Sequence, residues 1–416
     1  MKNNKLFYGW WIVLGGAIVL AVMGPASVAV ANLFQLPVTE EFGISNSQFA
    51  ISNSLVLGVG IFLSPFISKK LSTGNFKLIY SIAVIVYAFA YMGFGLAPNI
   101  YVFYLLSLLV GFGYTTTTII PISMLMNNWF VKKRGLALSL ALSGLGIGGV
   151  IFSQILTPLI STVGWRQTYL IYGVIMLVVT LPIVLFVFKP RPELMNLTAY
   201  GAEELINSNK GDKEQTQTQA QRKQVTGAKT GLTPFFILLM VGAVLVGIVI
   251  NGGLGQFPPV LNNLHGATQG ALIISIYSAV GIIGKIILGN INDRYGTVAS
   301  TIYASILLVL TYFVMIFAEN FVLAIIMAIL FGLGNAIGTV SPPLITSAIY
   351  SADDFPKAYG YVQSGVQLGM TAGSLVAASI ADLTGTYTVS WVVLAIASAL
   401  VAVSWVASYR TSQKQV

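Results

Sequence analysis

Hydrophobic residues dominate this chain in runs of about 20, the length of helix that crosses the ~30 Å hydrocarbon core of a bilayer. Short polar stretches separate the runs. The pattern predicts twelve transmembrane helices, at 8–34, 48–68, 77–97, 100–126, 135–160, 166–188, 233–257, 268–289, 298–317, 320–347, 357–381 and 386–409. We therefore expect an all-α membrane protein.

The longest polar stretch, residues 189–232, lies between the sixth and seventh predicted helices. It contains SNKGDKEQTQTQAQRKQVTGAKTG, which has too little apolar surface to fold by itself. We interpret it as a disordered cytoplasmic linker. It would join an N-terminal six-helix bundle (1–188) to a C-terminal six-helix bundle (233–416).

The two predicted halves also share a sequence pattern. GFGYTTTTIIP (111–121) and GLGNAIGTVSP (332–342) have Gly, Gly and Pro at matching positions. GLALSLALSGLGIGG (135–149) and GYVQSGVQLGMTAGS (360–374) align Gly135 with Gly360, Gly144 with Gly369, and Gly148 with Gly373. Glycines at such spacings let membrane helices approach closely. The repeat predicts two pseudo-symmetric bundles with a cavity between them, the layout of a transporter.

Composition supports the membrane class and charge sets the orientation. The 416 residues are 56% hydrophobic and 8% charged, against roughly 25% charged in soluble proteins. Of the 21 Lys and Arg residues, all but Arg166 and Lys285 fall in segments on one side of the predicted helices. The positive-inside rule makes that side cytoplasmic, so both termini are expected there, in a multi-pass protein of the cell (plasma) membrane. The same bias explains the net charge of +9 without nucleic acid.

Enzyme chemistry finds no support in the sequence. The chain has no cysteine and one histidine, His265, in a predicted loop. It has no G-x-x-x-x-G-K-[ST] phosphate loop and no Ser-His-Asp set. We expect no metal, no cofactor and no catalysis. Four acids fall at external helix ends or loops, where solvation explains them: Glu40, Glu41, Glu319 and Asp382.

Lys285 is the one ionisable residue that the pattern places inside a predicted span. A cation there can meet a substrate carboxylate through a charge-assisted hydrogen bond. Alternatively the lysine stem snorkels, since Asp293 at the end of the helix is ~12 Å away along the axis. The sequence favours the substrate role and leaves the alternative open.

GNINDRYG (289–296) resembles the G-x-x-x-D-R-x-G signature that the major facilitator superfamily carries between helices 8 and 9. The resemblance implies a gating or conformational role for Gly289, Asp293, Arg294 and Gly296. In the first half the equivalent loop, SPFISKKLSTG, has serines (Ser64 and Ser68) in place of the Gly and Asp.

Three further stretches resemble the monocarboxylate transporters and the bacterial oxalate:formate antiporter group. They are FYGWW (7–11), NWFVKKRGLALSLALSGLGIGG (128–149) and GWRQTYLIYG (164–173). The family commonly has an arginine where Lys285 stands, and the oxalate carriers have a second cation where this chain has Val366. One buried cation neutralises one carboxylate, which favours a monoanion. Gly334 and Gly338 replace the oxalate carriers' aromatic residues and imply a roomier site.

Other polar residues predicted within the helices are candidates to complete a substrate site with Lys285. They are Asn32, Tyr114, Thr117, Thr118, Asn251, Gln256, Tyr277, Asn335, Gln363 and Gln367. Each could instead make an interhelical hydrogen bond, worth ~0.6 kcal/mol in membranes. Gln363 and Gln367 share one helix face, being one turn apart.

We expect a monomeric carrier of a monocarboxylate-type organic anion that works by alternating access, with membrane lipids as its other partners. Proton symport, exchange for a counter-anion and uncoupled transport all remain open. The alternatives are an exporter of multiple drugs or amphipathic compounds, and a membrane receptor that binds an organic anion without moving it.

Overall fold

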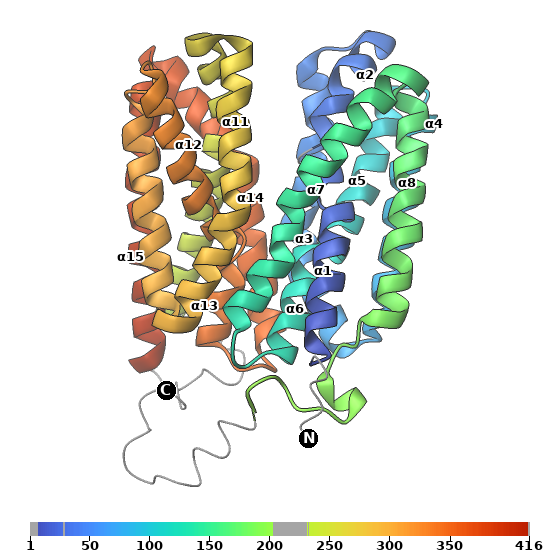
Figure 1. Cartoon of the computed structure of the whole chain (residues 1–416), viewed down its shortest axis with the longest axis vertical. Coiled ribbons are helices and arrows are strands. Elements are labelled where there is room, and N and C mark those ends of the chain that lie inside the picture. The colour runs from blue at the N-terminus through green and yellow to red at the C-terminus, as the bar shows by residue number, and fades with distance from the viewer. Residues whose placement is uncertain (1–6, 28–29, 203–230, 232, 415–416) are drawn as a thin grey trace, which may run out of the picture. The chain divides into compact units, whose positions relative to one another are not determined.

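The computed structural model describes residues 7–27, 30–202, 231 and 233–414, and its regular elements within these ranges are helices. The chain divides into two compact units (Figure 1). The first consists of Met1–Val131 and Leu140–Tyr200, and the second of Lys132–Ser139 and Gly201–Val416. The first turn of one long helix of the N-terminal half thus packs with the second unit.

The first unit contains long helices that the predicted spans anticipated, together with shorter turns that they did not. Its elements are α1 (Gly9–Met23), η1 (Pro25–Ser27), η2 (Ala31–Phe34), α2 (Gln35–Phe42), α3 (Asn46–Thr73), α4 (Phe76–Leu96), α5 (Ile100–Thr117), α6 (Ile119–Trp129), α7 (Arg134–Val163), α8 (Trp165–Pro182), η3 (Ile183–Val187) and η4 (Pro192–Met195).

The second unit begins with a helical run, α11 (Pro234–Met315), that two glycines interrupt. Gly266 and Gly296 have φ of +79° and +84°, so α11 is three helices, at 234–265, 267–295 and 297–315. The remaining elements are α12 (Phe321–Asn335), η5 (Ala336–Gly338), α13 (Ser341–Ile349), α14 (Phe355–Thr384) and α15 (Tyr387–Lys414).

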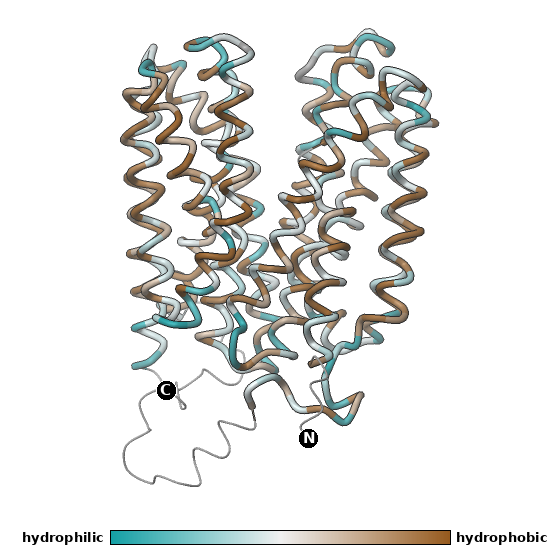
Figure 2. The backbone as a smooth tube through the Cα atoms, in the orientation of Figure 1, coloured by the Kyte–Doolittle hydropathy of each residue, from teal (hydrophilic) through white to brown (hydrophobic). Residues whose placement is uncertain are grey.

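Eleven helical stretches in the described ranges are long and apolar enough to cross a membrane. One of them, Thr268–Met315, has 48 residues and contains the break at Gly296, so it provides two crossings. Hydrophobic residues cover most of the length of the helices, and hydrophilic residues gather mainly at their ends (Figure 2). The prediction of an all-α protein with twelve spans is confirmed.

Two spans predicted as continuous helices are broken at equivalent positions of the two halves. α5 and α6 meet at Thr118, which has φ of −102° and ψ of −113°. In the second unit, η5 interrupts the path from α12 to α13. Each break precedes a proline, Pro121 or Pro342, whose ring clashes with the carbonyl four residues earlier and removes one helix hydrogen bond. These are the prolines that the internal repeat aligns.

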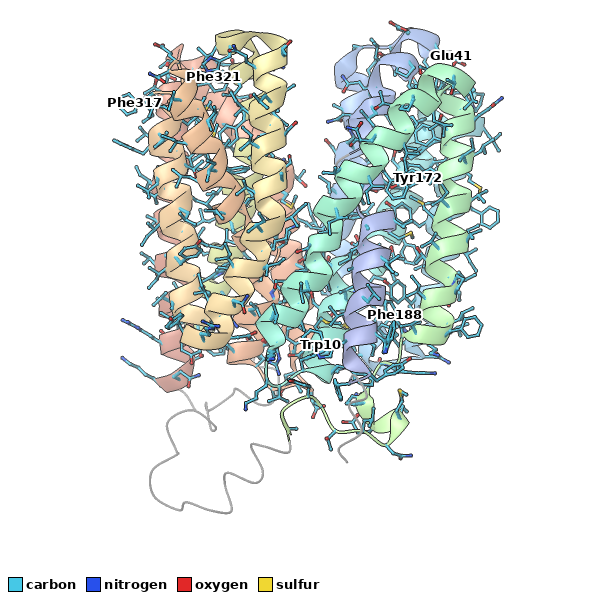
Figure 3. The ribbon with its side chains drawn as sticks, viewed as in Figure 1. Trp10, Glu41, Tyr172, Phe188, Phe317 and Phe321 are labelled. Atoms are coloured by element: carbon cyan, nitrogen blue, oxygen red, sulfur yellow. The ribbon has the colours of Figure 1, made fainter. Side chains whose placement is uncertain are left out.

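The first span is also discontinuous, because α1 ends at Met23 just before Pro25. Tyrosines from neighbouring helices bind the carbonyls that this ending frees. The hydroxyl of Tyr87, on α4, donates to the carbonyl of Met23 at 3.0 Å. The hydroxyl of Tyr172, on α8, donates to the carbonyl of Val22 at 2.9 Å. Figure 3 shows Tyr172 midway along the first unit.

A second tyrosine of α4 binds a carbonyl at the break in the fourth span. Tyr80 donates its hydroxyl to the carbonyl of Thr117 at 2.5 Å. Tyr80 and Tyr87 are seven residues apart, two helical turns, so they project from the same face of α4. Neither side chain has any exposed surface. Their hydroxyls therefore stabilise broken helices in an interior where water is not available.

The aligned glycines pack helices backbone to backbone in both halves. A Cβ on Gly144 or Gly148, in α7, would overlap the carbonyl oxygen of Ala17 or Ala21, in α1. A Cβ on Gly369 or Gly373, in α14, would likewise overlap carbonyl oxygens of α11, those of Val244 and Ile248. The close approach predicted from the repeat is thus present at both pairs of positions.

Glu41, expected to be merely solvated, forms an ion pair with Arg166. The Nη2 atom of Arg166 lies 2.8 Å from Oε1 of Glu41, and the indole Nε1 of Trp165 donates to Oε2 at 2.6 Å. The Nη1 atom of Arg166 donates to the carbonyls of Gly95 and Ala97, at 3.0 and 2.8 Å. The Arg166 guanidinium thus links the start of α8 to the end of α2 and to the end of α4. These contacts lie at the end of the first unit where Figure 3 labels Glu41.

The first residues of the predicted linker pack against the first unit. Trp129 donates its indole N–H to the carbonyl of Lys189 at 2.7 Å, and Phe130 pairs with Tyr200 in an isolated parallel bridge. The ring of Phe7 lies 5.4 Å from that of Tyr200. Most of the remaining predicted linker, 203–230 and 232, lies outside the described residues.

We predict that Tyr80→Phe and Tyr87→Phe each lower the free energy of unfolding by about 1 kcal/mol, because each leaves a buried carbonyl without its donor. The measurement is the unfolding midpoint of the purified protein in detergent. Tyr101→Phe is the control, since Tyr101 is 77% exposed. Equal midpoints for all variants would contradict the stabilising role of the two hydroxyls.

Candidate functional site

Lys285 lies in the 267–295 helix of α11, and its side chain is 9% exposed. The preceding residue, Gly284, faces the backbone of α12. A Cβ there would come 2.7 Å from the carbonyl oxygen of Gly332 and 2.8 Å from the Cα of Leu333. If the lysine side chain snorkelled along a lipid-facing surface, much of that side chain would be exposed. Lys285 is instead buried, next to a point where its helix packs closely on α12.

Tyr277 lies two turns before Lys285 on the same helix and is also buried. Its ring packs at 5.4 Å and nearly perpendicular to Phe331, of α12, and 6.4 Å from Phe257, in the 234–265 helix. Phe257 in turn contacts Trp391, of α15, at 5.5 Å. These rings form an apolar wall that joins four helices of the second unit.

Gln363 and Gln367 are both buried on α14. The hydroxyl of Tyr359, one turn earlier, donates to Oε1 of Gln363 at 3.2 Å. Val366 lies between them in sequence, at the position of the oxalate carriers' second cation, and is also buried. The structure therefore keeps the predicted pair of amides on a buried stretch of α14.

Asn251 and Gln256 hold helices together. The Nδ2 atom of Asn251 donates to the carbonyl of Met370 at 2.5 Å. The Nε2 atom of Gln256 donates to Oγ of Ser374 at 2.8 Å, and Oε1 accepts from the hydroxyl of Tyr387 at 2.9 Å. These bonds join α11 to α14 and α15, the interhelical role that the sequence left open.

Asn335 is the last residue of α12, at the start of the break in the tenth span. Two hydroxyls beyond it, those of Thr339 and Ser341, are buried without a hydrogen-bond partner among the described residues. Sequence reasoning missed them because a single Thr or Ser in an apolar run has no signature. The signal that could have identified them is Pro342, which predicts a broken helix, since discontinuous helices form transporter sites.

Gly334 and Gly338 do not widen the site, contrary to the expectation from the resemblance. A Cβ on Gly334 would contact Leu308 at 3.1 Å, and a Cβ on Gly338 would contact Ile250 at 2.9 Å. The space that larger side chains would occupy is therefore filled by neighbouring helices.

In the first unit, Tyr114, Thr117 and Thr118 are buried beside the break between α5 and α6. The Thr117 and Thr118 hydroxyls donate to carbonyls of their own helix, those of Gly113 and Tyr114, at 2.8 and 2.6 Å. Their oxygens keep lone pairs for a further partner, whereas their protons are engaged.

Asn32 lies on η2 and its side chain is exposed. Its Oδ1 atom accepts from Nδ2 of Asn53, on α3, at 3.3 Å. Asn32 therefore joins η2 to α3. The candidates divide between the units: four lie in the first, Asn32, Tyr114, Thr117 and Thr118, and seven lie in the second, Asn251, Gln256, Tyr277, Lys285, Asn335, Gln363 and Gln367.

The superfamily signature is helical, although the sequence placed it in a loop. The 267–295 helix includes Gly289, Asp293 and the exposed Arg294, and the chain turns at Gly296, whose φ of +84° favours glycine. The predicted span ended at 289 because polar residues follow, but those residues continue the helix beyond its apolar part.

The carboxylate of Asp293 binds the start of α7. It accepts hydrogen bonds from the backbone N–H groups of Gly135, at 2.7 Å, and Leu136, at 2.8 Å. These amides lack partners within their own helix, and a negative charge is favourable at that end of the helix dipole. Gly289 permits this approach, because a Cβ there would overlap the carbonyl of Gly135. This contact belongs to the second unit.

The chain belongs to the Major Facilitator Superfamily, whose sequence pattern matches residues 14–268 and 239–415. It is similar to an uncharacterized MFS-type transporter of Escherichia coli, YhjX, with 24% identity over 369 residues, 86% of this chain and 85% of that protein. Human monocarboxylate transporter 14 is 28% identical over 173 residues, 41% of this chain and 33% of the carrier. The structure of the proton:xylose symporter XylE has the same fold, with a TM-score of 0.73 at 14% identity, covering 95% of this chain and 94% of that one.

We predict that hydrogen–deuterium exchange at the amides of Gly135 and Leu136 becomes faster in Asp293→Asn and faster still in Asp293→Ala. The asparagine variant keeps an acceptor but loses the charge, and the alanine variant loses both. A helix cap of this kind is worth about 1 kcal/mol, roughly fivefold in exchange rate. Asp382→Asn is the control, since Asp382 is exposed at the far end of α14. Exchange unchanged in both variants would show that the carboxylate does not stabilise α7.

Proposed function

We propose that this superfamily member transports a monocarboxylate-type organic anion by alternating access, and that Lys285 pairs with the substrate carboxylate. The observation that carries the proposal is the burial of Lys285 on an otherwise apolar stretch of helix. Removing an ammonium group from water is costly, and an ionisable residue at such a depth marks a substrate or ion pathway by default. The similarity to a human monocarboxylate transporter supports the substrate class.

The charge of the site favours a monoanion. Val366 places an apolar side chain where a second cation would stand, and it is 2% exposed. A dianion would therefore bring one uncompensated charge into the interior, at a cost of several kcal/mol. Hydrogen bonds from Gln363 and Gln367, and from the hydroxyls of Thr339 and Ser341, would orient the substrate.

The proposed conformational element is the bond from Asp293 to the start of α7. Two backbone N–H groups and one carboxylate form it, and the charge of Arg134, at the start of α7, attracts the same carboxylate. Such a contact can form and separate as a unit while the helices keep their internal hydrogen bonds. We infer that it stabilises one of the alternating states, in a carrier of the cell membrane with both termini in the cytoplasm.

We predict that Lys285→Gln reduces uptake of labelled monocarboxylates into proteoliposomes at least about a hundredfold, because the amide cannot neutralise the anion. Lys285→Arg should retain part of the activity, since it keeps the charge but changes the donor geometry. The matched control is Lys357→Gln, an exposed lysine on α14. Uptake by the glutamine variant at the parent rate would exclude Lys285 from the site.

We predict that lactate competes for uptake at least about tenfold better than oxalate, because one cation leaves a dianion with an unpaired charge. The measurement is inhibition of labelled monocarboxylate uptake, with and without a pH gradient, which also separates proton coupling from exchange or uncoupled transport. Stronger inhibition by oxalate would contradict the single-cation site. Inhibition by hydrophobic cations and by neither acid would favour the multidrug exporter, and binding of lactate without uptake would favour the receptor.

A further inference from the structure

A hollow of about 470 Å³ lies in the first unit, between the turn that joins α3 to α4 and the chain that leaves α8. Three cations line it: Lys77, Lys189 and Arg191. The described residues that line it include no carboxylate. Figure 3 locates this end of the unit through Phe188, which precedes Lys189 and lies at the opposite end from Glu41. The positive-inside rule predicts that this end is cytoplasmic.

The backbone around the hollow holds Lys77 in position. The end of α8 widens into a single π-helical turn, η3, in which the N–H of Phe188 bonds to the carbonyl of Ile183. Within that turn the carbonyl of Leu185 accepts a hydrogen bond from the Nζ atom of Lys77 at 2.6 Å. One of the three N–H groups of the Lys77 ammonium thus donates to this carbonyl, and the other two can donate to further acceptors.

The segment that carries the other two cations is fixed by side chains of α6. The indole N–H of Trp129 donates to the carbonyl of Lys189 at 2.7 Å. The Nδ2 atom of Asn128 donates to the carbonyl of Pro190 at 3.0 Å. The positions of Lys189 and Arg191 at the rim of the hollow therefore follow from contacts with the helical body of the unit.

This arrangement brings like charges together. Lys77 and Lys189 both line the hollow, and both side chains are half-buried. Two like charges in a partly desolvated site repel each other, and an anion between them relieves the repulsion. Glu193, two residues beyond Arg191, is exposed and is not among the lining residues.

The surroundings of the hollow indicate which anion fits. Next to the cations, α4 and η3 carry large apolar side chains that are open on the surface: Leu78 is 57% exposed and Phe186 is 75% exposed. A free phosphate would leave these side chains uncovered. A phospholipid would place its phosphate among the cations and its acyl chains along the apolar surface.

We propose that this hollow is a binding site for the headgroup of an anionic phospholipid of the cytoplasmic leaflet. Lys77, Lys189 and Arg191 bind the phosphate, and the exposed apolar residues of α4 and η3 contact the acyl chains. The site lies within the first unit and contains none of the residues proposed to bind the transported anion. It therefore does not depend on the proposed function.

The test uses the full-length protein in detergent, with binding of added lipid measured by native mass spectrometry. The probes are phosphatidylglycerol, phosphatidylcholine and inorganic phosphate. We expect the parent to bind phosphatidylglycerol in preference to phosphatidylcholine. We expect the Lys77→Gln, Lys189→Gln, Arg191→Gln triple variant to lose that preference. A variant that removes three exposed cations of the second unit, Lys357→Gln, Arg410→Gln and Lys414→Gln, is the matched control and should bind like the parent.

Arg191→Gln alone keeps the test valid if the triple variant fails to fold, because Arg191 is exposed and its side chain can be replaced without disturbing the unit. We expect roughly fivefold weaker binding of phosphatidylglycerol, the effect of one surface cation. Equal binding of the two lipids by the parent would overturn the proposal, as would equal loss in the control variant. Competition by inorganic phosphate as strong as that by the lipid would overturn the assignment to a phospholipid.

Discussion

A free backbone carbonyl has no water to bind within a bilayer, so each one needs a partner inside the protein. This constraint explains why broken helices and buried tyrosines occur together. Pro25 and Pro121 each interrupt a helix, and hydroxyls of Tyr80, Tyr87 and Tyr172 bind carbonyls beside the interruptions. In the second unit a buried tyrosine also binds a backbone carbonyl, since the hydroxyl of Tyr312 donates to the carbonyl of Val249. The breaks after Met23 and at Thr118 are thus stabilised by tyrosines of neighbouring helices.

The few charges of the molecule also depend on fixed partners. Arg166 binds a carboxylate and two carbonyls at one end of the first unit, and Lys77 binds a carbonyl at the other end. Asp293 binds two backbone amides at the start of α7, where the charge of Arg134 also attracts it. In each case a backbone group holds the charged side chain, which allows a chain with 8% charged residues to position them accurately.

Hydropathy predicted the fold well, because the thickness of a bilayer sets the length of each helix. It could not show the breaks near Thr118 and after Asn335, since a proline changes a helix without changing its hydropathy. The internal repeat correctly predicted the close packing at Gly148 and Gly373. Burial of Lys285 followed from its apolar neighbours in sequence.

The individual partners at the candidate site could not be predicted in this way. Polar residues such as Asn251 and Gln363 look alike in sequence. Their different contacts depend on which face of each helix meets a neighbour, and the rotation of a helix is set by packing. The glycines at 334 and 338 illustrate the same limit, because a small residue creates space only where no neighbouring helix fills it.

The attachment of residues 189–200 to the first unit determines where the two halves can be separated. Tyr200 pairs with Phe130, and the carbonyl of Lys189 accepts a hydrogen bond from the indole N–H of Trp129. A chain divided after Phe188, at the end of the last apolar helix of the half, would lose both contacts and leave Phe7 without its aromatic neighbour Tyr200. A split version of the protein, made as two co-expressed fragments, should therefore be divided beyond Gly201. The N-terminal fragment then keeps residues 189–200, which pack against its own helices.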